Sequence, residues 1–191
     1  MMPRIFAFVL FIMSCATPAA AQTETDIQLA QYYYLNGEFS KALVYYEPLY
    51  ENDPSKVYFS RYLDCLVNTG DKKGAEKLFK KQIAFSPSDW PLKIQFYFFY
   101  KGLQESDKAK KIKNEIVKHD FIDPKEFQDL LENLLAIDEF DWAKQMVDRN
   151  KKNMSGYPFE LWYAQISTTE GDNIKALEYY LLALSKRSIL K

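Results

Sequence analysis

The chain has 191 residues, of which 25 are basic and 26 acidic, so its formal net charge at pH 7 is −1. Proteins that bind nucleic acid need an excess of basic residues to neutralise phosphates, so this balance argues against a nucleic-acid partner. The length is sufficient for one compact domain, or one short repeat array, that buries its core without disulfides or metals.

Residues 1–21 have the features of a secretory signal peptide. Arg4 precedes an apolar run over residues 5–13, and three alanines end at Ala21. The run is too short to span a membrane. Cleavage after Ala21 is the favoured interpretation. It predicts a chain that is exported across the inner membrane of a Gram-negative bacterium and is periplasmic or associated with the outer membrane.

The same segment contains an alternative signal at Cys15. The run Ile-Met-Ser-Cys that ends there resembles a loose bacterial lipobox, in which Cys15 becomes the lipidated N-terminus. After cleavage at Ala21, Cys65 is the only thiol, which excludes an intrachain disulfide. Cys65 lies on an apolar helix face, so it is predicted to be a small buried hydrophobe. The alternative, a reactive or intermolecular thiol, needs exposure and a lowered pKa.

An internal repeat organises the rest of the chain. The segment LNGEFSKALVYYEPLYENDPS, from Leu35, aligns with NTGDKKGAEKLFKKQIAFSPS, from Asn68, with a glycine, an alanine, an aromatic and a proline each displaced by 33 residues. Alanines in helical contexts extend the series to five repeats, at steps of 33, 34, 34 and 33 residues. They are Ala42, Ala75, Ala109, Ala143 and Ala176.

This pattern resembles the tetratricopeptide repeat, a 34-residue helix-turn-helix unit, over nearly the whole chain after residue 21. The resemblance is carried by a turn glycine or its substitute, the packing alanine, a following aromatic and a closing proline. Repeats one, two and five match best. Repeats three and four depart from the pattern, since Gln104 replaces the turn glycine and Lys113 and Val147 replace the aromatic. The turn residues are Gly37, Gly70, Asp138 and Gly171, the aromatics Tyr46, Phe79 and Tyr180, and the prolines Pro54 and Pro87.

The resemblance implies an all-α fold, a right-handed solenoid of helical hairpins. The expected repeats cover residues 23–56, 56–89, 90–123, 124–156 and 157–191 of one domain over residues 22–191. Apolar residues at three- and four-residue steps support two helices in each repeat.

Two local signals refine the helix boundaries. The run from Asp123 through Pro124 to Glu126 places an acid before a proline and a glutamate at the third helical position, which predicts a helix start at Pro124. Pro48 falls inside the second helix of repeat one. Because proline lacks the backbone donor, a kink or an early break is expected near Glu47.

The aromatic run QFYFFYKG, residues 95–102, is either core or a binding platform. The resemblance implies that Phe96, Tyr97 and Tyr100 pack against the neighbouring helix, whereas Phe98 faces a concave groove. The implied partner-binding residues of the groove are Ile27, Gln31, Tyr34, Asp64, Val67, Asn68, Ile94, Phe98, Lys101, Gln128, Glu132, Leu161 and Gln165, with Ser60, Leu135 and Thr168 on the same face.

These groove residues mix apolar, aromatic and amide side chains. Such a surface suits an extended peptide or a partner helix, since apolar pockets hold side chains and amides bind the backbone. The alternative is a solvated face without a partner. Tetratricopeptide domains that clamp a terminal carboxylate use lysine and asparagine at two groove positions. The clamp is absent here, because these positions hold Ile27 and Gln31 in repeat one, then Ser60 and Asp64 in repeat two.

The sequence contains few candidates for catalysis. His119 is the only histidine, so neither a zinc site nor a Cys/His nucleophile is expected, and it is predicted to lie at a helix C-terminus. The favoured function is a non-enzymatic adaptor of the cell envelope that needs no cofactor. One alternative is a lipoprotein subunit of an outer-membrane assembly or secretion machine. Another is an enzyme or glycan-handling accessory that uses Asp64 and Glu132.

Two surface features suggest further contacts. Lysines cluster on the second helices of repeats two and three, which is typical of a solvated face. The alternative is contact with anionic lipid headgroups or acidic cell-envelope polymers. The last helix carries Leu177, Leu181 and Leu184 without a following capping helix. This predicts self-association through that end or a longer natural chain.

Overall fold

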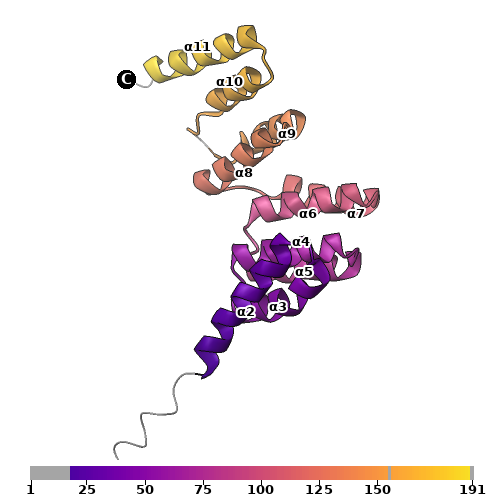
Figure 1. Cartoon of the computed structure of the whole chain (residues 1–191). Coiled ribbons are helices and arrows are strands. Elements are labelled where there is room, and N and C mark those ends of the chain that lie inside the picture. Colours follow the sequence, from indigo (N-terminus) through magenta and orange to yellow (C-terminus); the bar gives the residue numbers. More distant parts are fainter. Residues whose placement is uncertain (1–17, 155, 190–191) are drawn as a thin grey trace, which may run out of the picture. The chain divides into compact units, whose positions relative to one another are not determined.

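A computed structural model describes residues 18–154 and 156–189 of the chain, which divides into two compact units, residues 1–84 and 85–191. These are called the N-terminal unit and the C-terminal unit. The described residues form ten α-helices and no strand, which confirms the all-helical repeat class (Figure 1). None of these helices is both long and apolar enough to cross a membrane. Cys15 and most of the predicted signal peptide lie outside the described residues.

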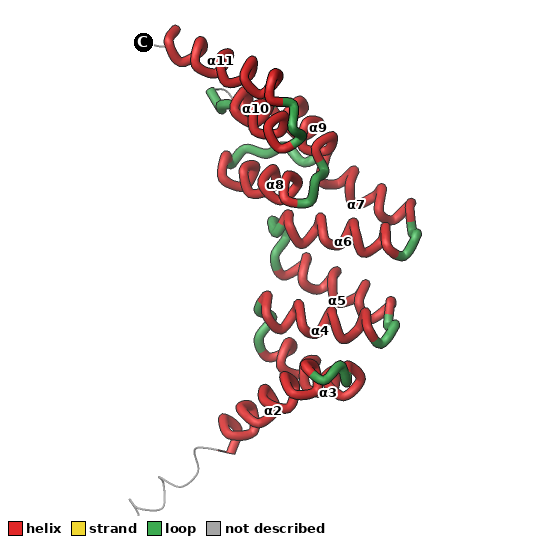
Figure 2. The backbone as a smooth tube through the Cα atoms, turned by 45° about the horizontal axis from the view of Figure 1, so that its top comes forward, coloured by secondary structure: helices red, strands yellow, loops and turns green. Residues whose placement is uncertain are grey.

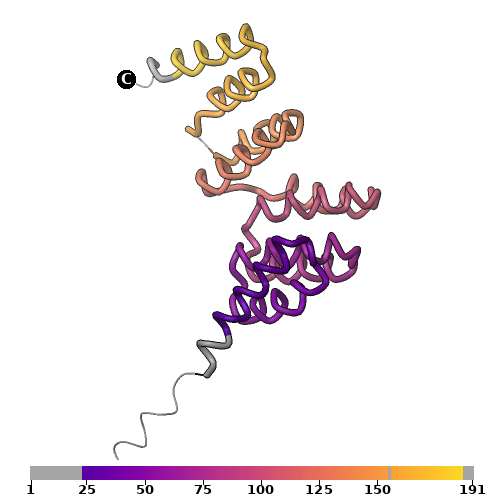
Figure 3. The backbone as a smooth tube through the Cα atoms, viewed as in Figure 1, coloured from indigo at the N-terminus to yellow at the C-terminus, as the bar shows by residue number. Residues whose placement is uncertain are grey.

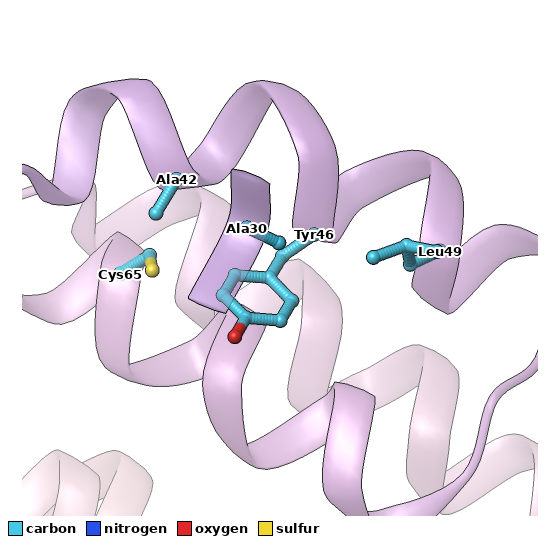
Figure 4. Close-up of a cluster of buried hydrophobic side chains, with 5 residues drawn as sticks. All are labelled: Ala30, Ala42, Tyr46, Leu49 and Cys65. Carbon is cyan, nitrogen blue, oxygen red and sulfur yellow. The ribbon is translucent and has the colours of Figure 1, made fainter. Parts of the chain in front are cut away.

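Four helices build the N-terminal unit. They are α2 (Pro18–Leu35), α3 (Phe39–Asn52), α4 (Lys56–Asn68) and α5 (Lys72–Phe85), whose last residue belongs to the C-terminal unit. Helix α3 packs against both α2 and α4. Figure 4 shows the Tyr46 ring of α3 among the small side chains of Ala30, Ala42 and Cys65. Small residues let the helices approach closely, and the large ring fills the remaining space.

Cys65 is fully buried in this core, as predicted. Burial raises the pKa of its thiol to about 11, because the thiolate loses hydration. A thiol with this pKa is almost entirely protonated at neutral pH. Cys65 is therefore a packing residue, and the alternative of a reactive thiol is wrong.

Six helices build the C-terminal unit, and their order along the chain can be followed in Figure 3. Helix α6 pairs with α7, α8 with α9, and α10 with α11, while α6 also contacts α8 and α9 contacts α10. Each pair is thus joined to the next one within the unit. The helices are α6 (Trp90–Gly102), α7 (Ser106–Lys118), α8 (Pro124–Ala136), α9 (Phe140–Asn150), α10 (Phe159–Thr169) and α11 (Asn173–Ile189).

Short turns, drawn in green in Figure 2, join the paired helices. The five turns share one backbone geometry. Each has a residue with positive φ at the predicted turn position, and each closes with the two backbone hydrogen bonds of a Schellman motif. Gln104 (φ 60°) and Asp138 (φ 58°) adopt this conformation although they are not glycine. The departures of repeats three and four therefore change the residue but not the turn. The other three turn residues are Gly37, Gly70 and Gly171.

Replacing Gln104 by glycine is expected to stabilise the C-terminal unit by about 0.5–1 kcal/mol. Left-handed φ costs a non-glycine residue roughly 1–2 kcal/mol, and the greater freedom of glycine in the unfolded chain offsets part of that gain. The reverse control is Gly171→Gln, where an added Cβ meets no atom within 4 Å, so only backbone strain changes. Urea unfolding should show opposite shifts for the two variants, and a loss of stability in Gln104→Gly would contradict this account.

The packing alanines confirm the repeat register. All five are buried, with at most 4 % of their surface exposed. The predicted helix start is also confirmed, since α8 begins at Pro124 and the Asp123 carboxylate accepts a hydrogen bond from the Lys125 backbone N–H at 2.8 Å. Glu126 instead accepts a hydrogen bond from Trp90 Nε1 at 2.6 Å, which joins α8 to α6.

Pro48 does not end α3, so the expected break near Glu47 is wrong. Both Pro48 and Val44, four residues earlier, are exposed, which places them on the solvent side of the helix. Proline removes the donor that would serve the Val44 carbonyl, but water can bind that carbonyl on this side. The buried side of α3 continues to Leu49 and Tyr50 and holds the helix together.

Candidate functional site

The N-terminal unit has a pocket of about 200 Å³ formed by α2, α3 and α4. Its walls combine aliphatic and tyrosine side chains with one amide and one guanidinium. A cavity of about 150 Å³ is large enough for benzene, so this pocket can hold one aromatic or branched aliphatic side chain. It is lined by Ile27, Gln31, Tyr34, Leu35, Tyr46, Val57, Tyr58 and Arg61.

Tyr34 connects the helices that form the pocket. Its hydroxyl donates a hydrogen bond to the Asp64 carboxylate at 2.8 Å, which links α2 to α4. Its ring meets those of Phe39 and Tyr46 edge to face, at centroid distances of 5.7 and 6.0 Å. Partial burial raises the pKa of Tyr34, and the hydrogen bond to Asp64 raises it further. Tyr34 is therefore a neutral side chain that lines the pocket and is held in place by its contacts.

Arg61 provides the positive charge of the pocket. Its guanidinium carbon lies 4.4 Å from the centroid of the Tyr34 ring, which is a cation–π contact. A hydrogen bond with Tyr34 is the main cause that raises the pKa of Arg61. Within the part of the chain that the structure describes, no carboxylate lies within 4.0 Å of this guanidinium. Sequence analysis missed Arg61, because its position in the repeat is not on the groove face. The length of the arginine side chain could have indicated its role, since a long side chain can reach over Tyr34 from that position.

The structure brings three predicted groove residues, Ile27, Gln31 and Tyr34, into this pocket. Asp64 stands behind it as the acceptor for Tyr34. Two other predicted residues lie at the end of α4, outside the pocket lining. Val67 is 53 % exposed, and the Asn68 amide donates to the Asp64 carbonyl at 2.7 Å.

In the C-terminal unit, two groove predictions are wrong. Ile94 is only 4 % exposed and Leu135 only 7 %. Ile94 follows Trp90 by one helical turn and precedes Tyr97 by another, so it shares their buried face. Leu135 shares the buried face of Leu131 for the same reason. Ile94 and Leu135 were assigned to the groove from the positions that face it in regular repeats. In α6 and α8, extra apolar residues widen the buried face, so these two positions are buried.

The aromatic run in α6 is mainly core. Phe96, Tyr97 and Tyr100 are buried, as predicted, and the Tyr97 ring meets that of Trp142 at 5.0 Å. Phe98 is half-buried, with its ring 4.9 Å from that of Tyr97. The Lys101 amine lies 5.4 Å from the centroid of the Phe98 ring and is exposed. Of the groove residues predicted on α6, Phe98 and Lys101 therefore reach the surface, whereas Ile94 does not.

The other predicted groove residues of the C-terminal unit are exposed on their helices. The Gln128 amide donates to the Glu132 carboxylate at 2.7 Å on α8. Gln165 is exposed on α10. Leu161, also on α10, lines a second pocket of about 710 Å³ next to α11. This pocket is mainly apolar, with Met154, Phe159 and Leu184 among its walls.

The described residues contain no group of three or more histidine, cysteine, aspartate or glutamate side chains that could hold a metal ion. His119 follows the last turn of α7, as predicted, and its ring lies 4.5 Å from that of Trp90. The two candidate catalytic acids have other partners, since Asp64 accepts from Tyr34 and Glu132 from Gln128. They also lie in different compact units.

No family model matches the sequence, and no curated protein matches it. Three similar solved structures are a tetratricopeptide repeat protein from Parabacteroides merdae, MamA from Desulfovibrio magneticus and a further MamA. The first is 13 % identical, with 87 % of this chain and 67 % of that chain covered and a TM-score of 0.43. The second is 13 % identical (87 % and 96 % covered, TM-score 0.43), and the third 15 % identical (87 % and 92 %, TM-score 0.41).

Proposed function

We propose that this chain is a non-enzymatic interaction scaffold that holds an extended peptide, or a helix of a partner protein, against the pocket between α2 and α4. The pocket itself carries the proposal. It is large enough for one apolar side chain. Gln31 and Arg61 line the same pocket, where they can bind polar groups of the partner. Peptide-binding grooves combine the same two elements, side-chain pockets and polar groups that fix the backbone.

A pull-down from an envelope extract tests this function. The double variant Gln31→Ala/Leu35→Ala removes two exposed side chains of the pocket and leaves the core of the unit intact. We expect it to retain a specific partner at least about fivefold less than the unmodified chain, since wall contacts of this kind contribute roughly 1 kcal/mol or more. Val44→Ala is the control, because Val44 is 68 % exposed on α3 and lies outside the pocket. Equal partner lists for all three proteins would refute the pocket as the binding site.

We also propose that the scaffold acts in the cell envelope, either in the periplasm or at the outer membrane. The support is the sequence of residues 1–21, with its apolar run and its small residues before Gln22. The lipoprotein alternative depends on Cys15 alone. If Cys15 is lipidated, a Cys15→Ala precursor loses its association with membranes. A variant that still fractionates with membranes removes this alternative.

Self-association through α11 is a further element of the proposal. Leu177, Leu181 and Leu184 follow one another at helical spacing and are 57–62 % exposed. Exposed apolar stripes of this kind favour burial against another helix. If a second copy covers the stripe, the average mass measured by sedimentation should rise as the protein concentration is raised from about 1 to 100 µM. A monomer throughout that range would contradict it.

A further inference from the structure

The pocket between α2 and α4 has a guanidinium, that of Arg61, beside an apolar hollow. Arg61 is charged at any physiological pH, and in the described part of the protein no carboxylate pairs with it. Asp64 acts on Arg61 through its charge, but its carboxylate accepts a hydrogen bond from the Tyr34 hydroxyl at 2.8 Å and forms no ion pair with Arg61. The positive end of Arg61 is therefore available to a partner.

The orientation of Arg61 is fixed before any partner arrives. Its guanidinium lies over the Tyr34 ring at 4.4 Å, and that ring is itself held by Asp64, Phe39 and Tyr46. An arginine that stacks on an aromatic ring keeps the edge of its planar group available for hydrogen bonds. A carboxylate can accept two parallel hydrogen bonds from such an edge, and charge-assisted bonds of this kind are stronger than neutral ones.

We infer that the pocket selects a partner segment in which an apolar side chain stands next to an acidic side chain. The apolar side chain enters the hollow between Ile27, Val57 and Tyr46, and the acidic side chain pairs with Arg61 at its wall. This inference rests on the proposed function and names the chemistry of the partner. The volume of about 200 Å³ limits the first residue to one side chain of roughly leucine or phenylalanine size.

Two fluorescein-labelled peptides that differ in one group test the selection. Both have a glycine-serine background and an amidated C-terminus, and they carry either Leu-Glu or Leu-Gln at the centre. With the full chain at low salt, fluorescence anisotropy should show the Leu-Glu peptide binding about three- to tenfold more tightly, because only it offers a carboxylate. A third peptide, with Ser-Glu, should bind more weakly than Leu-Glu, since it cannot fill the hollow.

Arginine variants assign the preference to one side chain. Arg61→Gln should bring the Leu-Glu and Leu-Gln peptides to equal affinity, whereas Arg61→Lys should keep part of the difference because it keeps the charge. The matched control is Lys77→Gln, which removes an exposed positive charge from α5 and should leave the preference unchanged. A near-normal circular dichroism spectrum of Arg61→Gln shows that the unit stays folded.

The outcomes separate this inference from the function on which it rests. Equal binding of the Leu-Glu and Leu-Gln peptides by the unmodified chain overturns the inference. A preference that survives in Arg61→Gln overturns it as well. In both cases the scaffold function stands if the Gln31→Ala/Leu35→Ala variant still loses its partner. Loss of the preference in Arg61→Gln alone, with affinity for the Leu-Gln peptide unchanged, establishes the inference.

Discussion

Replacing Phe127 by alanine is expected to lower the free energy of unfolding of the C-terminal unit by about 3–5 kcal/mol. Phe127 has no exposed surface, and its ring lies 5.4 Å from that of Phe121 and 6.1 Å from that of Phe159. It therefore joins the start of α8 to the loop before it and to the start of α10. Truncation removes these contacts and leaves a cavity that the surrounding helices can only partly close.

The measurement uses the distribution of tryptophan in the chain. Trp90, Trp142 and Trp162 are its three tryptophans, and all lie in the C-terminal unit. Tryptophan fluorescence in urea consequently follows this unit by itself. The control is Gln128→Ala, which changes the next residue on the exposed face of α8 and should alter stability by less than about 0.5 kcal/mol. A loss below about 1 kcal/mol in Phe127→Ala would show that the core around it is not closely packed.

Replacing Ala143 by leucine is the second change with a large expected effect. Ala143 is fully buried on α9, which contacts both α8 and α10. Its neighbours Met146 and Val147 are also fully buried, so the added atoms have no free volume to enter. Overpacking should cost about 1–3 kcal/mol, because helices must separate or side chains must leave their preferred rotamers.

Ala136→Leu is the matched control for this prediction. Ala136 is exposed at the end of α8, so the same substitution meets solvent there and should change stability by less than about 0.5 kcal/mol. Urea unfolding followed by tryptophan fluorescence compares the two variants. If Ala143→Leu is as stable as Ala136→Leu, the repeated alanine does not mark a close helix contact, and its regular spacing would need another explanation.

The turns and the packing alanines could be predicted from the sequence because each depends on one residue in a local setting. The alanine spacing located Gln104 and Asp138 at turn positions although neither is glycine, and both have positive φ in the structure. The start of α8 was predictable for the same reason, since the Asp123 cap acts within three residues.

Features that depend on several helices could not be predicted in this way. Asn150 is fully buried, and its side chain accepts a hydrogen bond from the Phe121 backbone N–H, 29 residues earlier. Lys93 is 8 % exposed, where it pairs with Glu115 at 3.0 Å and lies over the Trp90 ring at 4.4 Å. A helical pattern gives no sign of such contacts, because both residue types are usually exposed.

In the candidate site, too, the features set by local spacing could be predicted and those set by contacts between helices could not. Ile27, Gln31 and Tyr34 could be placed on one face from helical spacing alone, and all three line the pocket. Arg61 could not, because its role follows from the reach of its side chain across Tyr34. Ile94 was assigned to the wrong face, since the repeat pattern does not account for the extra aromatic residues of α6.

Site-specific photocrosslinking tests the scaffold function most directly. A photoreactive benzoylphenylalanine replaces Leu35 at the pocket or, as control, Val44 on α3; these side chains are 81 % and 68 % exposed. On irradiation in cells, a discrete adduct with another protein is expected from position 35 and none from position 44. The yield of this adduct should fall when Gln31→Ala is added, because a contact at the pocket is removed. No adduct from position 35, or the same adducts from both positions, would contradict a binding scaffold centred on this pocket.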